Sequence, residues 1–250
     1  MTEADMSQPN EDQLPLGPWD AGALATLEAW DRSWADACRT MSTDPWSGKV
    51  LPLRMVELVC VATSVACTTL DGAATRRHMR AALAAGASRD ELMTIVKMAT
   101  VMAIHSCSLG APILLEEAAA AGAALPSHPA TPTPACDAMK RLGQWNQAWD
   151  PFFALDPAWT DAFMATGAGI YSAGVFTAKE TELLSIAFDV SFRHMYAPGT
   201  RRHIHGALAA GASVAEIMEV LKLCVAQGVA ASNLGVAILA EELARPAHGG

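Results

Sequence analysis

Apolar residues recur along this chain in long runs and rarely alternate with period two. The runs from Leu53 to about Thr68 and from Ala178 to about Arg193 are each long enough for a buried helix. Two later stretches, Met98 to Leu115 and Leu223 to Ala240, carry no charged side chain over 18 residues. The pattern therefore predicts an all-α protein with almost no strand.

The two uncharged stretches just reach the length of a membrane span. They also contain polar or helix-breaking residues, among them His105 and Pro112 in the first and Gln227 and Asn233 in the second. We interpret them as a buried helix pair, each broken at a glycine near its middle. Such apolar helices often form an oligomer interface as well as a core.

The chain repeats itself with an offset of 125 positions. Thr75 to Ser88 and Thr200 to Ser213 are identical at 11 of 14 positions, and the same offset holds without a gap well beyond them. A Pro-rich stretch at 125–136 lies between the copies and favours an extended linker. We predict four parts: a 1–29 extension, a first repeat at 30–120, a linker and lead-in helix at 121–154, and a second repeat at 155–250.

Each repeat contains the same helix signals. A second helix is predicted at Thr75–Ala85 and Thr200–Ala210, each with a glycine at its C-terminal end, Gly86 or Gly211. In the second copy the breaker pair Pro198–Gly199 predicts a turn before that helix. A serine and a glutamate with the spacing of a capping box then open a third helix: Ser88 and Glu91, Ser213 and Glu216.

Composition narrows the class of protein. The net charge is −9, the pI is about 5.2 and basic runs are absent, which argues against nucleic acid as a partner. The polar, acidic N-terminus has no signal-peptide pattern. The six cysteines form no Cys-x-x-Cys pair and match no zinc spacing. We expect reduced thiols in a cytoplasmic protein without a membrane span.

The candidate chemistry gathers in the second repeat. Glu182 lies in an otherwise apolar helix, where a carboxylate is costly unless it is paired or protonated. Glu57 occupies the same place in the first repeat, and His203 is likewise repeated as His78. Asp189 and Arg193 share the helix stripe of Glu182. Either they form a solvated i,i+4 ion pair, or they belong to a site.

His194 and Tyr196 lie in the turn before His203, where the first repeat has Thr69 and Asp71. Imidazole suits proton transfer because its pKa lies near neutrality. The difference between the copies fits specialisation of the second one, and it fits drift equally well.

Further candidates surround this set. Arg201 and Arg202 precede the shared histidine and either hold a substrate carboxylate or form salt bridges on a solvated face. His105, together with Cys107, is confined to the first repeat and suggests a second, divergent pocket. A metal on Glu182, His194 and His203 matches no known spacing, so we predict no metal and no cofactor.

These residues resemble the carboxymuconolactone decarboxylase and alkylhydroperoxidase D superfamily. The shared features are a glutamate in the first core helix and a histidine followed by A-L-x-x-G-A-[ST]-x-x-E-[IL], here HMRAALAAGASRDEL from His78 and HIHGALAAGASVAEI from His203. The resemblance implies helical hairpins packed in a disc-like homo-oligomer. A duplicated chain would resemble two fused subunits, so a trimer of such chains is expected.

The peroxidase branch of the superfamily needs a Cys-x-x-Cys motif upstream of the histidine. His194 and Ala197 stand at those positions in the second repeat, and Thr69 and Gly72 in the first. Thiolate chemistry by that route is not expected.

The resemblance to the decarboxylase branch implies cofactor-free decarboxylation of small carboxylated lactones or cyclic keto acids from aromatic catabolism. His194 or His203 would donate to the developing oxyanion, the other or Glu182 would carry the proton to carbon, and Tyr196 would bind the substrate carbonyl. Arg201, Arg202, Glu57, His78 and His105 are candidate substrate contacts. The 21-residue spacing from glutamate to histidine exceeds the family pattern by about two, so the intervening turn is altered.

Two other functions stay open: peroxide reduction by an isolated thiol such as Cys107, and a helical scaffold or binding module without catalysis.

Overall fold

The computed structural model describes residues 17–142 and 144–245, and this part of the chain is helical with no β-strand. The all-α prediction is confirmed. The helices of the first half are α1 (Ala21–Trp30), α2 (Arg32–Thr43), η1 (Asp44–Ser47), α3 (Leu53–Val65), α4 (Gly72–Ala84), α5 (Arg89–Val101), η2 (Met102–Ile104) and α6 (His105–Ala121). Those of the second half are α7 (Pro134–Arg141), η3 (Gln147–Trp149), α8 (Asp150–Leu155), α9 (Pro157–Ser172), α10 (Ala178–Val190), α11 (Ala197–Ala209), α12 (Val214–Ala226) and α13 (Val229–Ala244).

The core is built around the contact between α3 and α10, the equivalent first core helices of the two repeats. Each forms a hairpin with the helix that follows it, α4 or α11, and α5 and α12 pack against this central group. Because α3 and α10 have neighbours on most sides, their apolar residues form one continuous buried cluster rather than one core per repeat.

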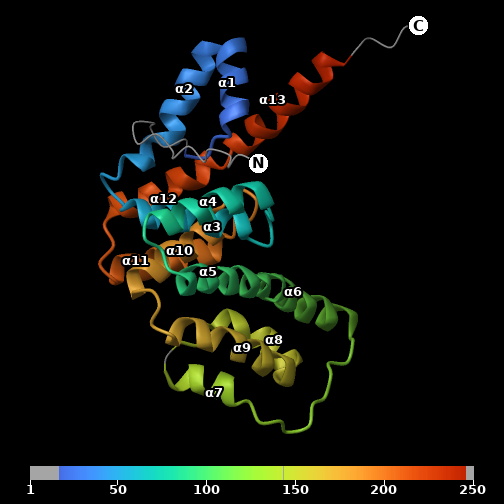
Figure 1. Cartoon of the computed structure of the whole chain (residues 1–250). Coiled ribbons are helices and arrows are strands. Elements are labelled where there is room, and N and C mark those ends of the chain that lie inside the picture. The colour runs from blue at the N-terminus through green and yellow to red at the C-terminus, as the bar shows by residue number, and fades with distance from the viewer. Residues whose placement is uncertain (1–16, 143, 246–250) are drawn as a thin grey trace, which may run out of the picture.

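The repeats exchange their outer helices. Helices α1 and α2, which precede the first core helix, pack against α13 and α12 of the second repeat, while α8 and α9, which precede the second core helix, pack against α6 and α5. Figure 1 shows this at the two ends of the molecule: α1 and α2 lie beside α13, and α7–α9 lie below α5 and α6. Each repeat therefore supplies a wall to the space in front of the other repeat's helical hairpin.

Several local predictions are confirmed. The capping boxes Ser88–Glu91 and Ser213–Glu216 are both formed, with the backbone and side-chain hydrogen bonds in place. Gly86 (φ 91°) and Gly211 (φ 84°) adopt the left-handed conformation that ends the preceding helices.

Three local predictions are wrong. Pro198–Gly199 does not form a turn: it lies in the first turn of α11, where proline is tolerated because those N–H groups have no helical partner. The first apolar stretch breaks at Met102–Ile104 and not at a glycine, and Gly110 lies inside α6. The second does break at a glycine, Gly228, but near its start and not at its middle. The last three residues of the 125–136 linker, from Pro134, already belong to α7.

The first core helices end earlier than the apolar runs predict, at Val65 and Val190 instead of about Thr68 and Arg193. Each is followed by a short turn that contains a residue with positive φ, Leu70 (φ 50°) or Met195 (φ 52°). The turn links the core helix to its hairpin partner, α3 to α4 or α10 to α11.

Two helical segments, Arg89–Ala121 and Val214–Ala244, are long and apolar enough to cross a membrane by length and composition alone. Only 22% of each most apolar window is buried within the chain. Large apolar side chains are exposed along α6 and α13 at partly equivalent positions, which we call the apolar stripes: Leu109, Ile113 and Leu114 on α6, and Leu234, Ile238, Leu239 and Leu243 on α13. Exposed patches of this kind mark interaction surfaces.

We expect further copies of the chain to cover the apolar stripes, because both repeats carry them and a closed oligomer can bury both. A charge placed in such an interface is costly, so Leu114→Glu with Leu239→Glu should reduce the oligomer size. Sedimentation equilibrium of the purified protein measures this, and Leu142→Glu, at an exposed position outside the stripes, is the control. A wild-type protein that is monomeric at all concentrations would contradict the expectation.

Candidate functional site

A pocket of about 740 Å³ lies in front of the α10–α11 hairpin. Its walls come from three parts of the chain: α10 and α11 of the second repeat, the α5–η2–α6 segment of the first, and residues 144–149 of the linker with part of α9. The volume is within the usual range for small-molecule sites, about 300–1,000 Å³. The exchange of outer helices thus creates a cavity that neither repeat could form alone.

His203 and Glu182 form a close pair in this pocket. His203 Nδ1 and Glu182 Oε2 are 2.7 Å apart, and both side chains line the cavity. An ionised Glu182 accepts the Nδ1–H of the ring, and Nε2 lies on the other side of the ring, 3.7 Å from Asp189 Oδ2. Gly206, one turn further along α11, makes room for this arrangement: a Cβ there would lie 2.7 Å from Cδ of Glu182.

The Asp189 carboxylate is more deeply buried than Glu182 or His203. Its side chain is 2% exposed, and Oδ2 has no hydrogen-bond partner although it lies 3.7 Å from His203 Nε2. Burial is the main cause that raises its pKa to about 6, and the nearby His203 and Arg202 partly oppose the shift. A Cβ at Gly199 would overlap this carboxylate, so glycine is required where α11 passes it.

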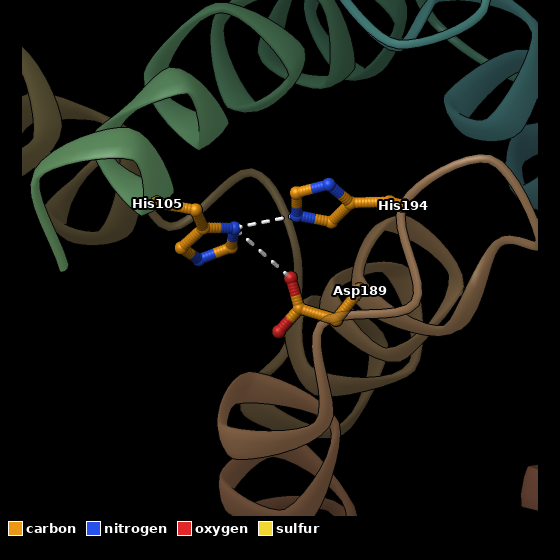
Figure 2. Close-up of side chains that lie close together, drawn as sticks. All are labelled: His105, Asp189 and His194. Carbon is orange, nitrogen blue, oxygen red and sulfur yellow. Dashed lines mark hydrogen bonds and ion pairs between the residues drawn. The ribbon is translucent and has the colours of Figure 1, made fainter. Parts of the chain in front are cut away.

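His105 reaches the same site from the first repeat. Its Nδ1 lies 2.7 Å from His194 Nε2 and 3.7 Å from Asp189 Oδ1. Figure 2 shows the two imidazoles turned toward each other above the Asp189 carboxylate. Burial is the largest cause that lowers the pKa of His105 to about 4, with His194 adding to it, and burial also lowers the pKa of His194. With a pKa of about 4, the His105 ring is neutral at neutral pH.

Tyr196 and Arg202 complete the wall. The Tyr196 ring stacks on His105 with centroids 4.0 Å apart, which holds the imidazole in place. The Arg202 guanidinium lies 5.7 Å from the centroid of Trp149, a linker residue. A cation held over an aromatic ring is attracted to it and remains available to an anion in the pocket.

The structure brings together most of the candidates from the sequence. Glu182, His203, Tyr196, Arg202 and His105 line the pocket, and His194 contacts His105 from behind. Arg201 does not line it: this residue is exposed and borders a separate hollow between α10 and α11. The expected separate pocket around His105 is not formed, since His105 belongs to the second-repeat site.

The equivalent pair in the first repeat is closed off. His78 Nδ1 and Glu57 Oε2 are 2.7 Å apart, as in the second repeat, but the Trp46 indole donates to Glu57 Oε1 at 2.6 Å. The cavity beside them has a volume of about 40 Å³. Ala81 stands where the second repeat has Gly206, so the two glutamates also differ in the space beside them.

The first-repeat cavity keeps an arginine, Arg77, where the second has Arg202, but it lacks three other polar groups of the site. The positions equivalent to Asp189, His194 and His105 are Ser64, Thr69 and Ala230, and all three line the small first-repeat cavity. Glu57 and His78 are therefore not substrate contacts of the open pocket. They form a buried hydrogen-bonded pair that joins α3 to α4.

Sequence reasoning left the role of Asp189 open and missed the linker wall. The solvated Asp189–Arg193 pair does not form: Arg193 Nη1 donates to the Thr69 carbonyl instead. The signal for Asp189 was its position on the Glu182 stripe, together with a glycine at 199 where the first repeat has Ala74. Nothing in the linker sequence indicated that residues 144–149 would turn toward the pocket.

The residues that could hold a metal ion are not the set weighed from the sequence. Within the described part of the chain, ligand atoms of His105, Asp189 and His194 lie within 4.8 Å of one another. They combine one residue of the first repeat with two of the second.

Comparison with known proteins agrees with the fold and with the repeat. The model of the carboxymuconolactone decarboxylase family matches residues 33–106 and 157–241, which together are more than half of the chain. The chain belongs to this family. A comparison with curated protein sequences finds no significant match.

A solved structure from Burkholderia xenovorans LB400, described as a "putative gamma-carboxymuconolactone decarboxylase subunit", is 27% identical to this chain. The similarity covers 91% of this chain and 93% of that one, with a TM-score of 0.81. The whole two-repeat arrangement, and not one repeat alone, is thus shared with a known structure.

Gly206→Ala tests the space beside Glu182. Alanine normally stabilises a helix interior by about 1 kcal/mol relative to glycine, but here its methyl group would meet the Glu182 carboxyl. We expect no net stabilisation and loss of the Glu182–His203 hydrogen bond, read from urea unfolding and from the ¹⁵N shifts of the His203 ring. Ala81→Gly is the matched control and should cost about 1 kcal/mol of helix stability. A stabilised Gly206→Ala protein with unchanged His203 shifts would contradict this.

Proposed function

We propose that the chain is a decarboxylase, or a closely related lyase or isomerase, that acts on a small carboxylated lactone or cyclic keto acid in the second-repeat pocket. The observation that carries the proposal is the Glu182–His203 pair, which faces a cavity walled by apolar side chains with one cationic group, Arg202, at its side. Membership of the carboxymuconolactone decarboxylase family supports the reaction class.

Arg202 is suited to hold an acidic substrate. Among the described residues that line the pocket it is the only one with a permanent positive charge. The chain as a whole has a net charge of −9 and repels anions, so local attraction has to come from this side chain. A guanidinium can bind a carboxylate or a developing enolate oxygen through two parallel hydrogen bonds.

The apolar walls favour loss of CO2. Met98, Phe163 and Met164 line the cavity, and Trp145 and Trp149 cover it from the linker. A carboxylate that enters this space exchanges water for apolar surface, which destabilises its charge, and departure of neutral CO2 relieves that cost.

The proton transfer follows from the orientation of His203. When the bond between the ring carbon and the carboxylate breaks, its electron pair moves into the adjacent carbonyl and gives an enolate. Arg202 stabilises the enolate oxygen. The doubly protonated His203 ring donates Nδ1–H to Glu182 and delivers its Nε2 proton to carbon, which leaves a neutral ring to be protonated again. One proton is taken up from solvent for each CO2 released.

Thiol chemistry is not supported by the positions of the cysteines. Cys107, the thiol considered from the sequence, packs against the cluster between α6 and α7–α9 and does not line the pocket. Cys60 and Cys224 are buried, and burial raises the pKa of both thiols, so they carry little thiolate.

The proposal is tested by CO2 release from a panel of carboxylated lactones and cyclic keto acids. His203→Ala should lower kcat by about 10²–10⁴-fold, because it removes the proton donor. Glu182→Gln should lower kcat with little change in KM, because the ring loses its orientation but the substrate contacts remain.

His78→Ala is the matched control in the first repeat. It should cost about 1–3 kcal/mol of stability by leaving the buried Glu57 without its partner, with kcat per folded protein unchanged. Absence of turnover with every acid in well-folded wild-type protein would favour the scaffold function instead. Equal losses of kcat in His78→Ala and His203→Ala would show that the site is misplaced.

Trp149→Ala tests the linker wall. This change removes an aromatic surface from the pocket and the ring beside Arg202, so KM should rise about 10-fold with a smaller effect on kcat. Steady-state kinetics on the best substrate of the panel measure the split. Trp30→Ala, at an exposed position far from the pocket, is the control. An unchanged KM would show that the linker does not contact the substrate.

A further inference from the structure

We propose that His105, Asp189 and His194 form a binding site for one divalent transition-metal ion of the zinc type. The donor atoms are His105 Nδ1, His194 Nε2 and Asp189 Oδ1, and they lie within 4.8 Å of one another. This proposal does not rest on the proposed function, because metal binding is measured in the absence of substrate.

Two of the three distances between ligand atoms lie close to those of such a site, and all three atoms lie within 4.8 Å of one another. Bonds of about 2.0–2.1 Å in a tetrahedral zinc site place the ligand atoms about 3.3 Å apart. His105 Nδ1 lies 2.7 Å from His194 Nε2 and 3.7 Å from Asp189 Oδ1, on either side of that value. A slight rotation of the imidazoles would open the first distance and close the second.

The burial of Asp189 points independently to a cation. The carboxylate is 2% exposed, and no hydrogen bond compensates for its removal from water at Oδ2. Buried carboxylates are normally hydrogen-bonded, paired or bound to a metal. A cation on Oδ1 would balance the charge of this buried carboxylate, while Oδ2 lies 3.7 Å from His203 Nε2 on the other side.

The surroundings also resemble a metal-site support. Tyr196 stacks on His105 and restrains that ring, and His203 Nε2 lies 3.7 Å from the second oxygen of Asp189. Outer groups of this kind orient metal ligands and raise affinity. Since His105 and Asp189 line the pocket, the ion would present an open coordination position to it.

Two imidazoles and one carboxylate select the chemical class of ion. Imidazole ligands favour zinc, copper, nickel and iron over magnesium and calcium, which prefer oxygen ligands. Three protein ligands with an open fourth position are typical of catalytic zinc sites. The sequence predicts no metal because the spacing matches no motif, but a spacing rule cannot detect ligands contributed by two repeats.

The residues around the first-repeat cavity predict how many ions each chain binds. The equivalent positions around the first-repeat cavity are Ala230, Ser64 and Thr69, which offer no imidazole or carboxylate. One ion per chain is therefore expected, although the chain contains two copies of the fold.

The test is a titration of untagged, chelator-treated full-length protein with zinc sulfate in a buffer that does not bind zinc, followed by isothermal calorimetry. We expect one zinc per chain. Asp189→Asn, His105→Ala and His194→Ala should each weaken binding by at least about 10–100-fold. His205→Ala, an exposed histidine outside the cluster, is the matched control and should bind as the wild type does.

Circular dichroism and thermal unfolding show whether each variant folds, and Asp189→Asn preserves the shape of the side chain. An X-ray fluorescence scan and anomalous difference map of zinc-soaked crystals locate the ion. Density between His105, Asp189 and His194 supports the proposal. No binding at micromolar zinc, or binding that the three substitutions leave unchanged, would overturn it.

Discussion

The packing of α3 against α10 is the contact on which the rest of the structure depends. Both helices are apolar on most sides, so neither repeat can bury its core without the other. Their contact places the two hairpins back to back and brings the C-terminal helices of each repeat in front of the hairpin of the other. A pocket in this fold is therefore lined by both repeats. A site residue can differ between the repeats because each hairpin faces a different wall.

This arrangement explains how two similar repeats carry different pockets. The glutamate–histidine pair is retained in both, with the same 2.7 Å contact, because it joins the core helix to its hairpin partner. Beside the first-repeat pair, Trp46 covers the glutamate and small side chains replace Asp189, His194 and His105, and the remaining cavity is about 40 Å³. The second repeat keeps about 740 Å³ and lines it with ionisable groups. The shared pair alone thus supports the fold, and the groups around it distinguish the working pocket.

Much of the fold could be predicted from the sequence, because it depends on local patterns. The repeat, the capping boxes and the glycines that end α4 and α11 are all determined within a few residues. The site could be predicted only in part, since its members lie far apart in the chain. His105 and His194 are 89 positions apart and come from different repeats, so neither repeat contains both of them. Pro198–Gly199 was misinterpreted because a Pro-Gly pair is compatible both with a turn and with the first turn of a helix.

Asp189 shows why the second-repeat pocket differs from an ordinary cavity. A buried carboxylate with an unpartnered oxygen destabilises the folded protein, and Ser64 shows that the same scaffold folds without one. The helix that passes it also carries Gly199, which weakens that helix relative to the alanine of the first repeat. The buried carboxylate and the glycine that it requires are hard to explain by packing, because packing alone would favour the serine and the alanine. They are explained if the carboxylate serves a charged or proton-bearing species in the pocket, and His203 on one side and His105 on the other are placed to share it.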